Sequence, residues 1–324
     1  MHAANVGCAG TYGADPWTRK ARELLRDMFE TDCETFFVFN GTAANALALS
    51  SICKSHNGIY CHRWAHIETD ECGAPGFFTG GAKLLLIDGE GGKISGEGLQ
   101  AAIDYRSDIH YAGPRALSLT QSTELGTVYT PGQVRGLSDI AHKHGVLVHM
   151  DGARFANAVA SLGAPPADIA WKAGVDVLSF GGTKNGLAVG EAVVFFNHDL
   201  AREFEYRMKQ AGQLASKMRF LAAGWVGVLE NGAWLTHATH ANDRAATLES
   251  ELRQIPGVRI MFAREANAVF VWMPESLSEG LFDRGWHFYT LMGQGDFRLM
   301  CSWATSDDDI RAFVGDAREL ATRG

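Results

Sequence analysis

The chain has 324 residues, a length that suggests one large or two ordinary domains. Its 29 basic and 37 acidic side chains leave a formal charge of −8, which argues against a nucleic-acid partner or an anionic membrane surface, because both require a basic face. Apolar residues make up 46 % of the chain, which is enough to build a sizeable core and excludes general disorder.

Neither a membrane segment nor a secretory leader is indicated. No apolar run approaches the ~20 residues that span a bilayer, and residues 1–10 lack a basic stretch followed by an apolar one. The six cysteines contain no Cys-x-x-Cys pair and are typical of reduced thiols. We therefore expect a soluble protein that stays in the cytoplasm.

Short apolar runs alternate with longer amphipathic segments in the first two thirds of the chain. Unbroken apolar runs are typical of strands buried on both faces of a parallel sheet, and residues 17–30, 96–105 and 133–144 have helical periodicity. This alternation predicts right-handed βαβ crossovers and an α/β domain. The predicted strands cover residues 36–39, 83–87, 116–119, 146–150, 175–180 and 192–196.

The pattern changes after about residue 198, where long helical stretches give way to a strand-rich tail. We expect a large α/β domain over residues 1–232 and a smaller α+β domain over residues 233–324. The predicted helices cover 199–213 and 214–254, and the predicted strands cover 258–262, 268–273, 288–292 and 297–302.

Ligands of open α/β sheets bind beyond the carboxyl ends of the strands, so the residue after each predicted strand is a candidate. The first strand is followed by Asn40, Gly41 and Thr42, which open a helix and direct free N–H groups toward an anion such as phosphate. The alternative is that this Gly-Thr pair is only a turn with an N-cap.

Two further strand ends carry an acid and an amine. Asp151 follows the strand at 146–150, and a buried carboxylate there needs a cationic partner, either a cofactor's pyridine nitrogen or Arg154. Lys184 follows the strand at 175–180, where a partly desolvated amine can bind a carbonyl covalently. A lysine in such a glycine-rich turn is more often a solvated surface residue.

These three strand ends together match the needs of one cofactor. Pyridoxal 5'-phosphate requires an anion cradle, a carboxylate that keeps its pyridinium charged, and an amine for its aldehyde. The competing class, a nucleotide-binding or dehydrogenase-like α/β protein, requires a Gly-x-Gly-x-x-Gly turn after the first strand. The sequence lacks that turn.

Four strings, FNGTAANALAL, AHIETDECGA, HMDGARFANA and SFGGTKNG, resemble those of low-specificity L-threonine aldolases. These are fold-type-I pyridoxal-phosphate enzymes of the β-eliminating lyase/threonine aldolase family, and the resemblance extends from about Tyr12 to Trp303. It implies retro-aldol cleavage of L-threonine, L-allo-threonine and related β-hydroxy-α-amino acids, phenylserine included, to glycine and an aldehyde. Another pyridoxal-phosphate reaction on this scaffold, β-elimination or racemisation, is the alternative.

The resemblance implies roles for residues at the matching positions. Lys184 matches the lysine that carries the cofactor, and Asp151 matches the acid paired with the pyridine nitrogen. Gly41 and Thr42 match the phosphate turn. His66 matches the histidine that stacks on the cofactor ring near the substrate hydroxyl.

Further matches concern the substrate and the quaternary structure. Arg154 and Arg298 match the arginines that bind the substrate carboxylate. Tyr12 and Lys209 match positions used across a subunit interface, with Lys209 directed to the phosphate, which implies a homo-oligomer, either a dimer or a dimer of dimers (a homotetramer). Glu124 stands where many relatives have a second active-site histidine, and we assign it to the substrate.

One metal-ligand spacing has to be weighed against this reading. His62 and His66 are four residues apart, with the acidic residues Glu68, Asp70 and Glu71 nearby, as in zinc sites on helices. The helical register is not clear through residues 69–73, and stacking on a cofactor ring already accounts for His66. We therefore predict no metal.

Overall fold

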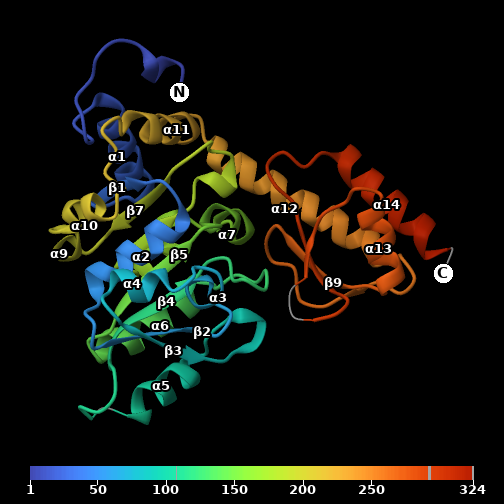
Figure 1. Cartoon of the computed structure of the whole chain (residues 1–324), viewed down its shortest axis with the longest axis horizontal. Helices are drawn as coiled ribbons and strands as arrows, with labels where there is room; N and C mark the ends of the chain where they lie inside the picture. The colour runs from blue at the N-terminus through green and yellow to red at the C-terminus, as the bar shows by residue number, and fades with distance from the viewer. Residues whose placement is uncertain (107, 291–292, 323–324) are drawn as a thin grey trace.

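The chain folds around two β-sheets, each with its own apolar core. The structure is a computed structural model that describes residues 1–106, 108–290 and 293–322. Figure 1 shows a larger part that contains the N-terminus, a smaller part that contains the C-terminus, and the long helix α12 (Ala233–Leu252) running from one to the other.

The larger sheet has seven strands in the order β1-β7-β6-β5-β4-β2-β3. Six of them run in the same direction, and β7 is antiparallel to both of its neighbours. Residues 181–190 between β6 and β7 are too few for a parallel crossover, which needs a dozen or more. The strands are β1 (Glu34–Val38), β2 (Asn57–His62), β3 (Lys83–Ile87), β4 (Gly113–Thr120), β5 (Leu147–Gly152), β6 (Val177–Phe180) and β7 (Glu191–Phe195).

The six strands predicted in this region are confirmed, with shifted ends. Strand β2 was not predicted, because its apolar run from Gly58 to Cys61 is short and is bounded by Asn57 and His62. Strands β6 and β7 are buried along their whole length, as expected for a central position in the sheet.

Helices surround this sheet, and their bounds follow local signals. Helix α1, for example, begins after Asp15, whose carboxylate accepts a hydrogen bond from Thr18 N at 2.8 Å, and has Pro16 as its first residue. The helices up to the end of β7 are α1 (Pro16–Phe29), α2 (Gly41–Ile52), α3 (His66–Thr69), α4 (Ala74–Phe78), α5 (Gly96–Tyr105), α6 (Pro131–Lys143), α7 (Phe155–Leu162) and α8 (Pro166–Ile169), with one-turn 3₁₀ helices η1 (Ala3–Asn5), η2 (Glu90–Gly92), η3 (Trp171–Ala173) and η4 (Thr183–Asn185).

The two long helices predicted over 199–213 and 214–254 are wrong as continuous elements. The first consists of α9 (His198–Ala201) and α10 (Phe204–Gln210), and the second of α11 (Arg219–Glu230) and α12. Gly232 separates α11 from α12 with a φ of 70°, a conformation that glycine adopts without steric cost.

The smaller sheet is antiparallel, in the order β10-β11-β9-β8, and packs with α12, α13 (Glu275–Asp283) and α14 (Asp307–Ala321) around the second core. The predicted strands at 258–262, 268–273 and 297–302 are confirmed in shorter form. Residues 291–292 of the prediction at 288–292 lie outside the described residues. The strands are β8 (Arg259–Ile260), β9 (Ala268–Trp272), β10 (Tyr289–Thr290) and β11 (Asp296–Met300).

Helix α12 contributes to both cores. Trp234 and Ala238, near its start, belong to the core of the larger part, whereas Ala245, Leu248 and Leu252 belong to the core of the smaller part. None of the helices in the described ranges is both long and apolar enough to cross a bilayer.

Candidate active site

A cavity lies at the carboxyl edge of the larger sheet, where the ends of β5 and β6 meet the start of α2. Its lining includes Thr42, His66, Asp151 and Lys184, together with Glu191 from β7. Residues predicted from four separate stretches of sequence therefore converge on one space, in the place that parallel sheets reserve for ligands.

The start of α2 lines one end of the cavity. Asn40 caps the helix by accepting a hydrogen bond from Ala43 N at 2.9 Å, and its carbonyl accepts one from Ala44 N at 3.1 Å. Gly41 and Thr42 thus carry the exposed N–H groups at the positive end of the helix dipole. The turn serves as an N-cap and also faces the cavity, so both readings of the sequence apply.

Asp151 is buried at the end of β5 and is held by amide groups. Its Oδ2 accepts a hydrogen bond from Asn45 Nδ2 at 2.8 Å, and its Oδ1 accepts one from Ala153 N at 3.0 Å. Across the described ranges, no basic side chain lies within ion-pair distance of this carboxylate, so Arg154 does not serve as its partner. Lys184, Arg154 and His66 nevertheless act on the Asp151 charge at longer range.

Lys184 lies in η4, in the turn that connects β6 to the antiparallel β7. Its side chain is open to the cavity, but protein surrounds the cavity, and this burial lowers the pKa of its amine, with the nearby Arg154 guanidinium lowering it further. A lowered pKa increases the fraction of neutral, nucleophilic amine. Lys184 is exposed, and the space to which it is open is the cavity that Asp151 and Thr42 also line.

Glu191, which the sequence reasoning missed, fixes the turn that carries Lys184. Its carboxylate accepts hydrogen bonds from the backbone N–H groups of Gly182 and Thr183 and from the Thr183 hydroxyl. A side chain at Gly182 would collide with the Gly190 carbonyl at 2.6 Å, so the turn requires glycine there. The sequence signal that could have indicated Glu191 was its position directly before the apolar strand predicted at 192–196.

His66 begins α3, and its ring lines the cavity. Its Nδ1 lies 2.8 Å from Oε1 of the buried Glu71, and this hydrogen bond raises the pKa of the imidazole. Asn45 Nδ2 donates to the same Glu71 oxygen at 2.8 Å. Sequence reasoning gave no role to Asn45, although a buried asparagine within the apolar helix α2 was a usable signal.

Glu124 contacts the His66 backbone rather than its ring. Its Oε1 accepts a hydrogen bond from His66 N at 2.8 Å, and its Oε2 is buried without a partner among the described residues. Burial, with the Asp151 charge nearby, raises the pKa of this carboxyl to about 7. Glu124 therefore titrates near neutral pH.

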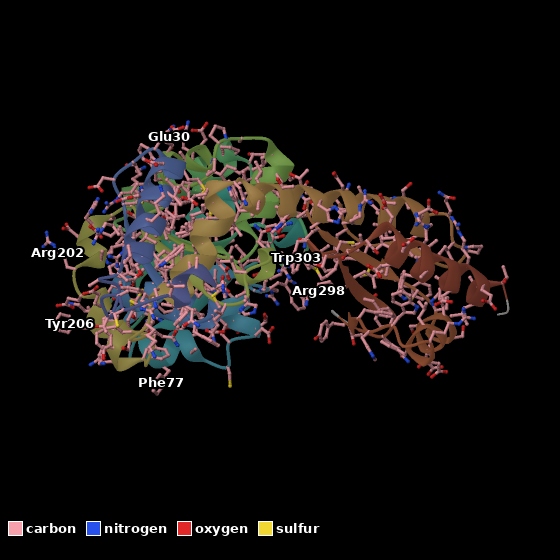
Figure 2. All side chains as sticks on the ribbon, turned by 90° about the horizontal axis from the view of Figure 1, so that it is seen from above. Glu30, Phe77, Arg202, Tyr206, Arg298 and Trp303 are labelled. Atoms are coloured by element: carbon pink, nitrogen blue, oxygen red, sulfur yellow. The ribbon has the colours of Figure 1, made fainter. Side chains whose placement is uncertain are left out.

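Two arginines approach the cavity from different parts of the chain. Arg154 stands at the N-cap position of α7, where its side chain makes no capping hydrogen bond, and burial together with the like charge of Arg298 lowers its pKa to about 10. Arg298 lies on β11 of the smaller sheet, and its Nε is buried without a partner in the described ranges. Figure 2 shows Arg298 and Trp303 where the smaller part faces the larger one. The two guanidinium groups repel one another until an anion lies between them.

Tyr12 and Lys209 lie together but not in this cavity. Lys209 Nζ, on α10, is 5.0 Å from the centre of the Tyr12 ring, and the Tyr12 side chain is exposed. Neither residue lines the cavity with Lys184. Their use from a second subunit remains a prediction.

The suspected zinc spacing does not lie on one helix. His62 ends strand β2, where its ring contacts the Gly89 carbonyl at 3.1 Å, whereas His66 begins α3. A different set, His66, Glu71 and Asp151, has its ligand atoms within 4.8 Å of one another. The Asn45 amide donates a hydrogen bond to each of the two carboxylates, in the position that a cation would have to take.

The fold and this cavity place the protein in the fold-type-I class of α/β enzymes. The likeness is shared with structures whose sequences are only distantly related, such as mouse CSAD, with a TM-score of 0.76 at 15 % identity. At that identity the comparison supports the fold alone.

The chain belongs to the beta-eliminating lyase family, whose sequence model matches residues 1–276. It is 55 % identical to the low specificity L-threonine aldolase of Pseudomonas sp. (strain NCIMB 10558), over 99 % of this chain and 92 % of that protein. It is 54 % identical to the low specificity L-threonine aldolase of Pseudomonas aeruginosa, over 98 % and 92 %. The family resemblance drawn from the motifs is confirmed.

A solved relative has nearly the same fold over its full length. The structure of Leishmania major threonine aldolase superposes with a TM-score of 0.93 at 26 % identity, covering 99 % of this chain and 94 % of that one. The predicted α/β fold-type-I architecture, with a mainly parallel sheet, is thereby confirmed.

Proposed function

We propose that the protein cleaves the Cα–Cβ bond of L-threonine, L-allo-threonine and related β-hydroxy-α-amino acids to give glycine and an aldehyde. The observation that carries this proposal is the convergence of Lys184, Asp151 and the start of α2 on one cavity, in a chain 55 % identical to a low specificity L-threonine aldolase.

The same cavity fits pyridoxal 5'-phosphate as the cofactor. A side-chain carbon at Gly41 would meet no protein atom within 4 Å, so an anion can approach the free N–H groups of α2. Each Asp151 oxygen has one donor and keeps a lone pair for a pyridinium N–H. Lys184 supplies an amine with a lowered pKa for the aldehyde. When bound, the cofactor supplies an electron sink for the charge left on Cα.

The remaining residues hold the substrate and move its protons. Arg154 and Arg298 bind the carboxylate between them, which relieves their repulsion and fixes the orientation of the bonds at Cα. His66 faces the cavity and accepts the proton of the β-hydroxyl as the Cα–Cβ bond breaks. Glu124, beside His66, lies on the hydroxyl side of the substrate.

We propose that the active form is a homo-oligomer, a dimer or a dimer of dimers, that works in the cytoplasm. The Lys209 amine and the Tyr12 ring are paired on the surface and remain outside the Lys184 cavity of their own chain. This arrangement supports a role in the cavity of a second copy, where Lys209 would face the cofactor phosphate.

The test is glycine and aldehyde release from the four stereoisomers of threonine. We expect cleavage of L-threonine and L-allo-threonine and no cleavage of either D-isomer, because the arginines fix Cα while Glu124 reads Cβ loosely. A preference above roughly a hundredfold between the two L-isomers, worth about 2.7 kcal/mol, would contradict the low specificity.

Control variants separate this reaction from other chemistry on the same scaffold. Lys184→Ala should remain folded and lose cofactor attachment, measured by mass after borohydride reduction, with turnover falling by several orders of magnitude. Ammonia with a keto acid as product would indicate β-elimination, and exchange between enantiomers would indicate racemisation. Either product without glycine would overturn the proposed reaction.

A further inference from the structure

The His66 ring is held through one nitrogen only. Its Nδ1 lies 2.8 Å from Glu71 Oε1, and the Glu71 side chain is completely buried. The other nitrogen, Nε2, has as its nearest charged neighbour the exposed carboxylate of Asp70, at 3.5 Å. The partner of one ring nitrogen decides which tautomer a histidine adopts and which atom it presents to a ligand.

The hydrogen bonds continue from Glu71 to the acid at the end of β5. The two N–H bonds of the Asn45 amide go to different carboxylates, one to Glu71 Oε1 and one to Asp151 Oδ2, both at 2.8 Å. Glu71 Oε1 therefore receives donors from Asn45 and from His66, which favours a charged carboxylate there although burial raises the pKa of Glu71.

We infer that Glu71 is a positioning residue for His66, an inference that rests on the function proposed above. Glu71 keeps the proton of the neutral ring on Nδ1, so that Nε2 presents its lone pair to the β-hydroxyl of the substrate. The proton leaves the hydroxyl oxygen for Nε2 while the Cα–Cβ bond breaks. Asn45 couples this pair to Asp151, so one network of hydrogen bonds fixes both His66 and the acid that would pair with the cofactor's pyridine nitrogen.

Other charged groups also act on the His66 ring. Asp70, from its own segment, and Asp151, from β5, favour the imidazolium, whereas Lys184, from η4, opposes it. Glu124 acts through the His66 backbone N–H. Among these groups the hydrogen bond that His66 Nδ1 donates to Glu71 has the largest effect on the pKa of His66. Removing the Glu71 charge should therefore change the pKa of His66 measurably, even with Asp70, Asp151 and Lys184 in place.

The first measurement is the titration of His66 in the purified protein by NMR of labelled histidine, assigned with His66→Asn. In Glu71→Gln, which keeps the shape but not the charge, we expect the pKa of His66 to fall by about one unit. Glu68→Gln, an exposed change on the same short helix, should leave it unchanged. A pKa of His66 that is the same in Glu71→Gln as in the wild type overturns the inference.

The second measurement is the separation of kcat from KM in the cofactor-loaded enzyme. Glu71→Gln should lower kcat for L-threonine at least about tenfold, with KM changed less than about threefold, and should move the acid limb of the kcat profile to lower pH. Glu71→Asp, which restores the charge one methylene further away, should recover part of kcat.

The two measurements keep this inference distinct from the proposed function. A wild-type enzyme that releases no glycine contradicts the proposed function, while the titration still tests the Glu71–His66 pair. A wild-type kcat in Glu71→Gln, or a loss confined to KM, overturns the positioning role. If Glu71→Gln fails to fold, the neutral tautomer of His66 in the wild type, read from the 15N shifts of the labelled ring, decides the question. A proton on Nδ1 supports the inference, and a proton on Nε2 overturns it.

Discussion

Individual carboxylates around the cavity differ in how they are satisfied. Asp151 is held by two amide groups, Glu191 by a backbone turn, and Glu71 by an amide and an imidazole. Glu124 has one backbone donor and one oxygen without a partner among the described residues. Burial raises the pKa of Glu124 to about 7 against the lowering effect of its hydrogen bonds with His66 N and Thr120, and burial also raises the pKa values of Glu71 and Glu191.

Because the pKa of Glu124 is raised in the folded state, ionisation of this carboxyl should lower the free energy of unfolding as the pH rises. The folded state holds the proton up to about pH 7 and the unfolded chain releases it near 4.5, so this contribution to stability is lost as pH rises through that window. The free energy of unfolding of the wild type should therefore fall, relative to that of Glu124→Gln, by about 2 kcal/mol as the pH rises from 5 to 8.

Urea unfolding at the two pH values measures the Glu124 effect. The exposed Glu97→Gln serves as the matched control and should run parallel to the wild type at both. An equal difference between Glu124→Gln and the wild type at pH 5 and pH 8 would show that Glu124 is ionised at no cost.

At the scale of elements, a polar ladder crosses three buried strands beneath the cavity. His149 on β5 is fully buried, with its Nδ1 2.9 Å from Ser118 Oγ on β4 and its Nε2 3.1 Å from Ser179 Oγ on β6. Burial lowers the pKa of His149 to about 4, so the ring is neutral in the folded protein. Ser179 lines the cavity, and the ladder therefore connects the sheet interior to the site.

His149 should make the protein less stable in acid. The unfolded chain takes up a proton below about 6.5 and the folded ring does so only near 4, so stability falls as pH falls through that range. Between pH 8 and pH 5 this amounts to about 2 kcal/mol. His149→Gln should lose that dependence and should cost about 1–3 kcal/mol at pH 8, where a serine hydroxyl is left unpaired.

Denaturant titrations at pH 5, 6, 7 and 8 give the free energy of unfolding of the wild type and of His149→Gln, and hence how steeply each depends on pH. His144→Gln, a change at the exposed histidine that follows α6, is the control for general acid sensitivity. A His149→Gln variant that is as acid-sensitive as the wild type would mean that the buried ring is already protonated.

Elements were predictable where the signal was local. Apolar runs indicated six strands of the larger sheet, and the residues that follow them pointed to Gly41, Asp151 and Lys184. The antiparallel direction of β7 was not predicted, although the sequence shows that the ten residues before it are too few for a parallel crossover. Glu71 and Glu191 were missed as site residues although their partners are near in sequence, His66 five positions away and Thr183 eight. Asn45 was missed because its partner is distant: it meets Asp151 across 106 positions. Such contacts exist only after the sheet has formed.

For the whole molecule, we propose that the two units divide near Gly232, as expected from the sequence. The separate cores and the left-handed Gly232 between α11 and α12 support this division. Tyr206 and Phe77 are more than three-quarters exposed, and Figure 2 shows both at the edge of the larger part away from the smaller one.

Mixing two inactive variants tests whether subunits share their sites. In a dimer whose cavities combine Lys184 of one chain with Lys209 of the other, chains carrying Lys184→Ala and Lys209→Ala should regain roughly a quarter of wild-type activity, since half of the dimers are mixed and each has one intact site. Mass spectrometry of the mixed dimers verifies that subunits have exchanged. If activity does not recover after exchange, Lys209 acts in the cavity of its own chain.

Helix α12 restricts where residues can be inserted into the chain or deleted from it. Each residue of a helix advances it by about 1.5 Å and turns it by about 100°. Because Trp234 and Ala238 are fixed in one core and Leu248 and Leu252 in the other, an insertion or deletion between them would rotate the whole smaller sheet and carry Arg298 away from Arg154. Surface loops tolerate changes in length, whereas the length of this helix sets the separation of Arg154 from Arg298, the two arginines that we propose bind the substrate carboxylate.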